Sequence, residues 1–197
     1  MKIERASERI NETRHGAAPS RGRTVKLTKM GMLVAISVVF SFIHFPILPT
    51  APFLEYELSD IPILVGGFVF GPVAGLVIAV VSILLHDLIA GSSSGPYGTI
   101  MHIIAVGVCV LVSAFIYKKK KTKKGACIAL CAGGLAMTAV MLPANLVITP
   151  LFMGLPISAV REMLLPAILP FNLIKAALNA VIVYIFYKMV SPFLHRW

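Results

Sequence analysis

The sequence predicts an all-α integral membrane protein of six transmembrane helices, and three observations lead to this fold class. Of its 197 residues, 58% are hydrophobic, and the mean hydropathy is +0.90. Only 13% are charged, about half the share that is typical of soluble domains. The apolar residues also fall into long runs, several near the roughly 20 residues that a helix needs to cross a bilayer. A soluble domain of this length could not bury so much apolar surface.

The six-helix membrane domain is expected over residues 26–191. Its helices are predicted at about 27–47, 61–70, 73–90, 97–117, 125–149 and 164–190. The prolines between Pro46 and Pro52 end the first helix, because proline cannot continue one. Ser59 or Asp60 is a plausible N-cap for the second helix, which is half the usual length and stops at Gly71-Pro72. Such a short span with a break is tolerated in a membrane where it lines a cavity.

The later helices are separated by turn residues and charges. Residues 91–96 form a glycine- and serine-rich loop, and the fourth helix ends at the lysine run that begins at Lys118. Pro143 is expected to kink the fifth helix, and residues 150–156 are expected to form a loop. An amphipathic stretch then leads into the sixth helix.

The charges predict the orientation. Of the 18 Lys and Arg residues, eight precede residue 30 and six lie between Lys118 and Lys124. Basic segments beside apolar spans stay in the cytoplasm, so we expect residues 1–25 to be a disordered cytoplasmic tail and 192–197 a short cytoplasmic C-terminus. Both termini of this membrane protein would then be inside the cell. The acidic residues between Glu55 and Asp87, with Glu162, would lie at or near the outer face. The basic clusters favour anionic lipid head groups over nucleic acid.

The motifs of several function classes are missing. The sequence has no phosphate-binding loop and no His-Glu-x-x-His or Cys-x-x-Cys metal pattern. The three cysteines fall inside apolar spans and predict neither a disulfide nor a metal site. We therefore expect a protein that is not an enzyme, has no ATPase of its own, and needs no metal or cofactor.

Polar residues inside the apolar spans are the best candidates for a binding site, because they are costly in lipid. Asn172, Lys175 and Asn179 stand at i, i+3 and i+7 of the sixth helix and share one face. This strip suits a neutral or weakly anionic ligand with carbonyl groups; the alternative is a polar clamp between helices. Asn145 lies at similar depth in the fifth helix, where a ligand contact and a helix–helix hydrogen bond are equally plausible.

Three further features are open to two interpretations. His102 and the pair His86-Asp87 lie near the outer helix ends, where structural hydrogen bonding is slightly favoured over ligand contact. Gly31 and Ala35 form a small-residue patch on the first helix that lets another helix approach closely. That patch serves either packing within the bundle or docking of a partner protein.

Together these residues resemble the substrate-binding S component of an energy-coupling factor (ECF) transporter, of the riboflavin-binding type. The resemblance extends from about Leu27 to Lys188. Its most specific segments are Phe45–Pro49, Phe53–Pro62, Gly71-Pro72 and Pro170–Lys175.

The resemblance implies a six-helix fold that holds a vitamin near the extracellular face. It implies that Leu54, Glu55 and Tyr56 cover the ligand and that Asn145, Asn172 and Lys175 hydrogen-bond its ring. It also implies that Gly31 and Ala35 pack against a coupling transmembrane subunit, which carries two ABC ATPases. The candidate substrate-binding residues are Leu54, Glu55, Tyr56, His102, Asn145, Asn172, Lys175 and Asn179.

One segment departs from the family pattern. Riboflavin binders often carry Glu and Asn early in the fourth helix, whereas this chain has Gly98–His102 there. An S component for another vitamin or a flavin precursor therefore remains an alternative. From a different class, a self-sufficient secondary carrier is disfavoured, because no inverted repeat is apparent and mid-membrane positions lack acidic residues.

Overall fold

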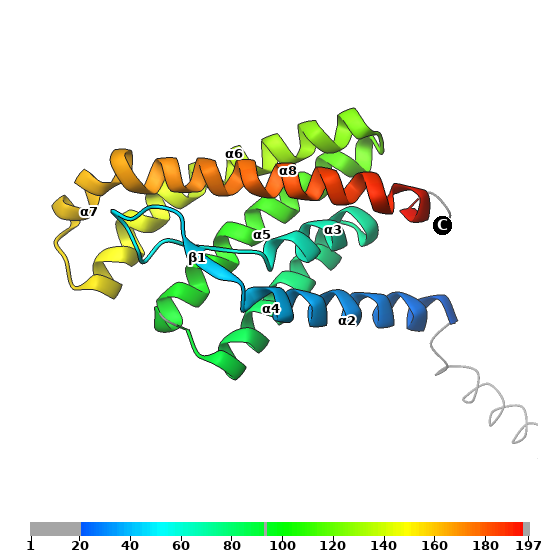
Figure 1. The fold of residues 1–197 in the computed structure, drawn as a ribbon, viewed down its shortest axis with the longest axis horizontal. Helices are drawn as coiled ribbons and strands as arrows, with labels where there is room; N and C mark the ends of the chain where they lie inside the picture. The colour runs from blue at the N-terminus through cyan, green and yellow to red at the C-terminus, as the bar shows by residue number, and fades with distance from the viewer. Residues whose placement is uncertain (1–20, 93, 195–197) are drawn as a thin grey trace, which may run out of the picture.

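The computed structural model describes residues 21–92 and 94–194. Over these residues the chain forms a bundle of helices with one small β-hairpin (Figure 1). The elements in chain order are α2 (Arg21–Ser41), β1 (His44–Pro46), β2 (Glu55–Glu57), α3 (Asp60–Phe70), α4 (Pro72–Ala90), α5 (Gly95–Lys119), α6 (Lys123–Met153), α7 (Ile157–Met163), the π-helix η1 (Leu164–Ile168) and α8 (Leu169–Leu194). The predicted six-helix fold is confirmed, with α7, η1 and α8 forming one span.

Five of the spans are long and apolar enough to cross a membrane, and α3 is a shorter apolar helix of 11 residues. The structure corrects three predicted boundaries. The first helix ends at Ser41 rather than at residue 47, because residues 44–46 pair with β2. Residues 21–25 of the predicted tail are helical, and α6 runs through Pro150 to Met153. Residues 1–20 of that tail, together with His195 and Arg196, lie outside the described residues.

The β-hairpin joins α2 to α3 and crosses one end of the bundle (Figure 1). Its strands are antiparallel, with Phe45 opposite Tyr56 and Pro46 opposite Glu55. The rings of Phe45 and Tyr56 are in contact, with centroids 5.6 Å apart. The hairpin is therefore a folded segment rather than a loose loop.

Glycines allow the helices to approach closely. A Cβ on Gly75 would lie 2.7 Å from the Cα of Gly67, so α3 and α4 pack backbone to backbone on either side of the turn at Gly71. That turn needs glycine, since its φ is +94°. A Cβ on Gly133 of α6 would lie 2.7 Å from the carbonyl oxygen of Cys109 in α5. These contacts fix the spacing of the helices around the interior.

The two ends of the bundle carry different segments (Figure 1). The beginning of α2, the α5–α6 connection and the end of α8 lie at one end. The hairpin, α7 and the α4–α5 connection lie at the other. Asp60, in the first turn of the short helix α3, is buried.

Candidate functional site

A cavity opens at the hairpin end of the bundle, between the β1–β2 connection and helices α5, α6 and α8. Its empty space, including the open mouth, is about 910 Å³. Phe53 and Leu54 of the β1–β2 connection and Glu55 of β2 line the cavity beside residues from the three helices.

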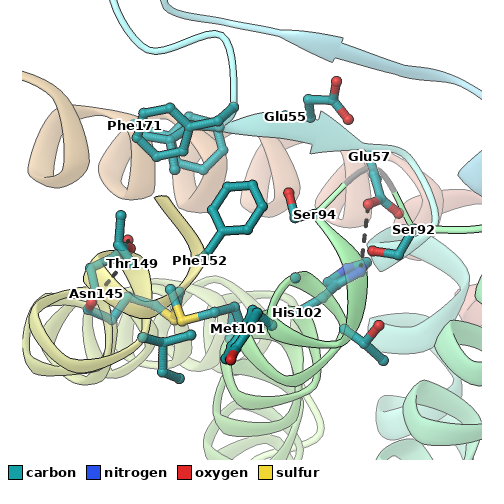
Figure 2. A pocket seen from close by; sticks show the side chains of 18 of the residues that line it. Glu55, Glu57, Ser92, Ser94, Met101, His102, Asn145, Thr149, Phe152 and Phe171 are labelled. Carbon is teal, nitrogen blue, oxygen red and sulfur yellow. Dashed lines mark hydrogen bonds and ion pairs between the residues drawn. The ribbon is translucent and has the colours of Figure 1, made fainter. Parts of the chain in front are cut away.

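Aromatic side chains make the apolar part of the wall. Phe152 comes from the last turn of α6 and Phe171 from the first turns of α8, and both lie within the cavity in Figure 2. Tyr97, in the first turn of α5, lines the same cavity. Flat rings from several elements give a surface on which a planar aromatic ligand can stack.

Two buried asparagines supply polar groups from α6 and α8. Nδ2 of Asn145 donates to the Met141 carbonyl at 2.8 Å, and its Oδ1 accepts from Thr149 Oγ1 at 2.9 Å (Figure 2). Nδ2 of Asn172 donates to the Ile168 carbonyl at 2.8 Å. None of the described residues hydrogen-bonds Oδ1 of Asn172, so this acceptor and one N–H remain for a ligand.

The backbone before Asn172 is irregular. The carbonyl that Asn172 caps belongs to the π-helix η1, which contains Pro166 and is followed by Pro170. Each proline removes one backbone donor, and π-helical turns are frequent at functional sites. The side-chain amide therefore also anchors the wider helical turn that leads into the cavity wall.

A buried ion pair lies behind the wall. Nζ of Lys175 is 3.2 Å from Oδ2 of Asp60, and both side chains are almost fully buried. Nδ2 of Asn179 donates to the same carboxylate at 2.9 Å, and Nε2 of His102 lies 3.1 Å from its other oxygen. A buried charge needs such partners, because an isolated one would be strongly destabilising in this surrounding.

The hairpin is tied to this cluster at two points. Nδ1 of His102 lies 3.5 Å from Oε1 of Glu57 in β2, the contact drawn in Figure 2. The hydroxyl of Tyr56 donates to Oδ1 of Asn179 at 2.9 Å. Burial, followed by the charge of Asp60, raises the pKa of the Tyr56 phenol. The covering segment is thus fixed to α5 and α8 by side-chain contacts.

The structure divides the predicted site residues into two groups. Six of them line the cavity: Leu54, Glu55, His102, Asn145, Asn172 and Lys175. Tyr56 and Asn179 are not among the lining residues and are hydrogen-bonded to each other behind it. The face shared by Asn172, Lys175 and Asn179 therefore serves both a cavity and an interior cluster, so the site and clamp interpretations each apply to part of the strip.

The remaining predicted features have clear places. His86 Nδ1 lies 3.3 Å from Oδ1 of Asp87, whose other oxygen accepts from Thr99 Oγ1, and Asp87 lines the cavity mouth. Gly31 and Ala35 are exposed on α2, and a Cβ on Gly31 would meet nothing within 4 Å. Within the part of the chain that the structure describes, the patch therefore does not pack against the other helices of the bundle.

Sequence reasoning missed two kinds of residue. Asp60 was interpreted only as a helix cap, although an acidic residue at the start of an apolar helix signals a buried partner. Ser59, the N-cap residue of α3, makes no side-chain capping hydrogen bond. The aromatic wall residues Phe152 and Phe171 carry no signal in an apolar sequence, because phenylalanine is common in membrane spans.

Comparison with known proteins places the chain in a family. Residues 25–187 match the family described as the ECF transporter, substrate-specific component. The riboflavin transporter FmnP of Bacillus subtilis (strain 168) is 30% identical over 179 residues, covering 87% of this chain and 94% of that protein. The riboflavin transporter RibU of Staphylococcus aureus (strain TCH60) is 32% identical over 184 residues, covering 87% and 93%.

A solved structure agrees with this assignment. The S component reported under "Structure and mechanism of the S component of a bacterial ECF transporter" superposes with a TM-score of 0.77 at 31% identity. The match covers 88% of this chain and 99% of that one. The chain therefore belongs to the family of substrate-specific components of ECF transporters, and it is a multi-pass membrane protein.

Proposed function

We propose that this protein is the riboflavin-binding subunit of an ATP-driven ECF vitamin importer and that the cavity beneath the β-hairpin holds the vitamin. The observation that carries the proposal is the meeting of Asn145, Asn172 and Lys175 in one cavity lined by aromatic rings. The names of relatives at 30% and 32% identity, both riboflavin transporters, support the same substrate.

The wall chemistry suits a flavin. The isoalloxazine ring is flat and carries carbonyl and ring-nitrogen groups along one edge, so amide side chains can both donate to it and accept from it. Stacking against Phe152 and Phe171 would bury roughly 150–250 Å² of ring surface, which contributes about 4–6 kcal/mol. The Asp60–Lys175 pair leaves the deep wall with little net charge, which matches an uncharged ring.

The β-hairpin, with the connection between its strands, acts as the lid of the cavity. Leu54 and Glu55 line the cavity, while Tyr56 and Glu57 hold the strand to Asn179 and His102. A lid that is already folded as a hairpin loses little conformational freedom when the ligand binds, and this favours tight binding.

Energy would come from partner subunits. We assign Gly31 and Ala35 on the exposed face of α2 to docking on a coupling transmembrane subunit that carries two ABC ATPases, since a small-residue patch permits close helix contact. In this assignment the chain has no ATPase and no catalytic role. Riboflavin is its transported ligand, and no cofactor is needed.

The orientation follows from the charges. The basic residues at the start of α2 and in the α5–α6 connection share one end of the bundle with the end of α8 (Figure 1). We therefore place this end and both termini in the cytoplasm of a bacterial cell, with the lid outside.

Riboflavin titration of the purified protein, followed by quenching of flavin fluorescence, tests the binding site. Asn172→Ala and Asn145→Ala each leave a ring group unpaired, so the Kd should rise roughly 10- to 100-fold. Thr138→Ala is the matched control, because Thr138 is also buried in α6 and bonds only its own helix at the Gly134 carbonyl. Equal affinity in all three variants and the natural protein would refute the site.

Co-purification with the coupling subunit tests the docking patch. Ala35→Trp should abolish the complex and leave riboflavin affinity unchanged, because a bulky side chain prevents close helix approach. Ile36→Trp places the same ring about 100° around α2 and should leave the complex intact. A complex that survives Ala35→Trp would contradict the assignment.

A further inference from the structure

A second cavity lies at the opposite end of the bundle from the cavity beneath the β-hairpin, which we call the vitamin cavity. It is a groove between the first turns of α2, the α3–α4 turn at Gly71 and the last turn of α5. Its empty space, including the open side, is about 1390 Å³. None of the contacts that build the vitamin cavity involves these residues, so the groove needs its own explanation.

The groove has a basic rim. Arg23 and Lys26 approach from α2, and Lys118 and Lys121 approach from the end of α5 and the residue run after it. All four are exposed, and none of the described residues that line the groove is acidic. Four cations from two separate segments thus converge on one opening that offers them no carboxylate.

The wall below the rim is apolar and open to the outside. Leu27 is 60% exposed, Val73 71% and Val77 47%. Phe68 and Phe70 of α3 extend this surface toward the interior. Exposed apolar wall directly beneath a cluster of cations is the pattern of an amphipathic ligand with a charged head and a hydrocarbon tail.

We propose that this groove binds one anionic phospholipid of the surrounding bilayer, with its phosphate head group among Arg23, Lys26, Lys118 and Lys121 and an acyl chain along Leu27, Val73 and Val77. Charge complementarity selects this occupant. A zwitterionic lipid would bring its own ammonium group to a rim that has no acidic side chain to receive it. A transmembrane helix of a partner would bury the four cations, at a high cost unless it supplied carboxylates.

The affinity of the purified protein for phosphatidylglycerol, measured by native mass spectrometry during titration in detergent, tests the proposal. The variant is Lys118→Gln/Lys121→Gln. Lys119→Gln/Lys120→Gln is the matched control, because it removes the same charge from the same run at residues that do not line the groove. Phosphatidylcholine serves as the control lipid.

The groove variant should bind phosphatidylglycerol roughly 30-fold more weakly, taking about fivefold for each basic side chain beside the head group. The matched control should keep its affinity, and phosphatidylcholine should bind weakly to all forms. Equal losses in the two double variants would reduce the effect to a general attraction between lipid and a basic surface and would overturn the proposal. Specific cross-linking of Val73 to a co-expressed coupling subunit, without retained phosphatidylglycerol, would assign the groove to that subunit instead.

This test is independent of riboflavin. Both double variants lie at the end of the bundle away from the vitamin cavity, so riboflavin affinity reports whether each variant is folded. If riboflavin does not bind the natural protein, the melting temperature of each variant reports whether it is folded. The measured lipid affinities then still test the proposal.

Discussion

The two ends of this bundle handle charge in opposite ways. At the vitamin end, Asp60 and Lys175 are buried and each contacts the other, with Asn179 and His102 completing the cluster. At the basic end, four exposed cations surround a groove that no acidic residue of the described part of the chain lines: Arg23, Lys26, Lys118 and Lys121. Buried charges fix one arrangement of helices because any other leaves them unpaired, whereas exposed charges constrain nothing within the fold and are available to outside ligands.

The largest expected effect breaks the buried cluster. Asp60→Asn keeps the shape of the side chain but leaves the ammonium of Lys175 without its counter-charge. The free energy of unfolding should fall by about 3–5 kcal/mol, the usual cost of removing one partner from a buried pair. Unfolding by SDS in mixed micelles measures it. Asp60→Asn/Lys175→Met should recover at least half of the loss, and a double variant as unstable as the single one would show that charge pairing is not the cause.

A somewhat smaller effect on binding should follow from removing one wall of the vitamin cavity. Phe152→Ala exposes the ligand ring on one side and should weaken riboflavin binding roughly 10- to 100-fold, as expected for losing one aromatic contact of about 1.5–3 kcal/mol. Phe115→Ala is the control from the basic half of α5, where the ring is 56% exposed and lies under Lys119. Isothermal titration of both variants makes the comparison. Similar riboflavin affinities in the two variants would show that the ligand ring does not stack on Phe152.

A modest effect should come from the lid anchor. Tyr56→Phe removes the hydrogen bond to Asn179, worth about 1 kcal/mol, so riboflavin should leave roughly fivefold faster in stopped-flow experiments. Because the pKa of Tyr56 is raised, the folded protein keeps this phenol protonated past the ordinary value of about 10. The difference in release rate between the natural protein and Tyr56→Phe should therefore stay constant up to a pH of about 10. An unchanged rate in Tyr56→Phe would remove the lid anchor from the mechanism.

The smallest effect is expected at the basic end. Arg23→Gln should change the free energy of unfolding by no more than about 0.5 kcal/mol, because an exposed charge outside an ion pair contributes little to folding. The same SDS unfolding assay used for Asp60→Asn gives the value. A loss comparable to that of Asp60→Asn would show that the two ends do not differ in the way described.

The sequence predicted the helices well because apolar length and proline breaks are local properties. The end of α3 and the start of α4 follow directly from Gly71-Pro72. The end of α2 was predicted six residues too late, since Phe42 to Ile47 are apolar enough for a helix and only their pairing with β2 makes them a strand segment. Strand pairing is a non-local contact, and the hydropathy of a segment does not predict it.

The site was predictable in part for the same reason. Asn145, Asn172 and Lys175 stood out because polar groups are rare in apolar spans, and all three line the cavity. The sequence could not show that Lys175 is paired with Asp60, or that Asn179 bonds the hairpin rather than lining the cavity. Those contacts join residues more than a hundred positions apart, as for the 119 positions between Asp60 and Asn179.

The long sequence separation of this cluster sets an order for biosynthesis. Chains are synthesised from the N-terminus, so Asp60 and Tyr56 emerge long before the helix that carries Lys175 and Asn179. Until α8 is inserted, the carboxylate of Asp60 has His102 of α5 beside it but lacks the ammonium of Lys175 and the amide of Asn179. The last helix therefore completes both the buried cluster and the anchoring of the lid, because Lys175 and Asn179 supply partners for Asp60 and Tyr56.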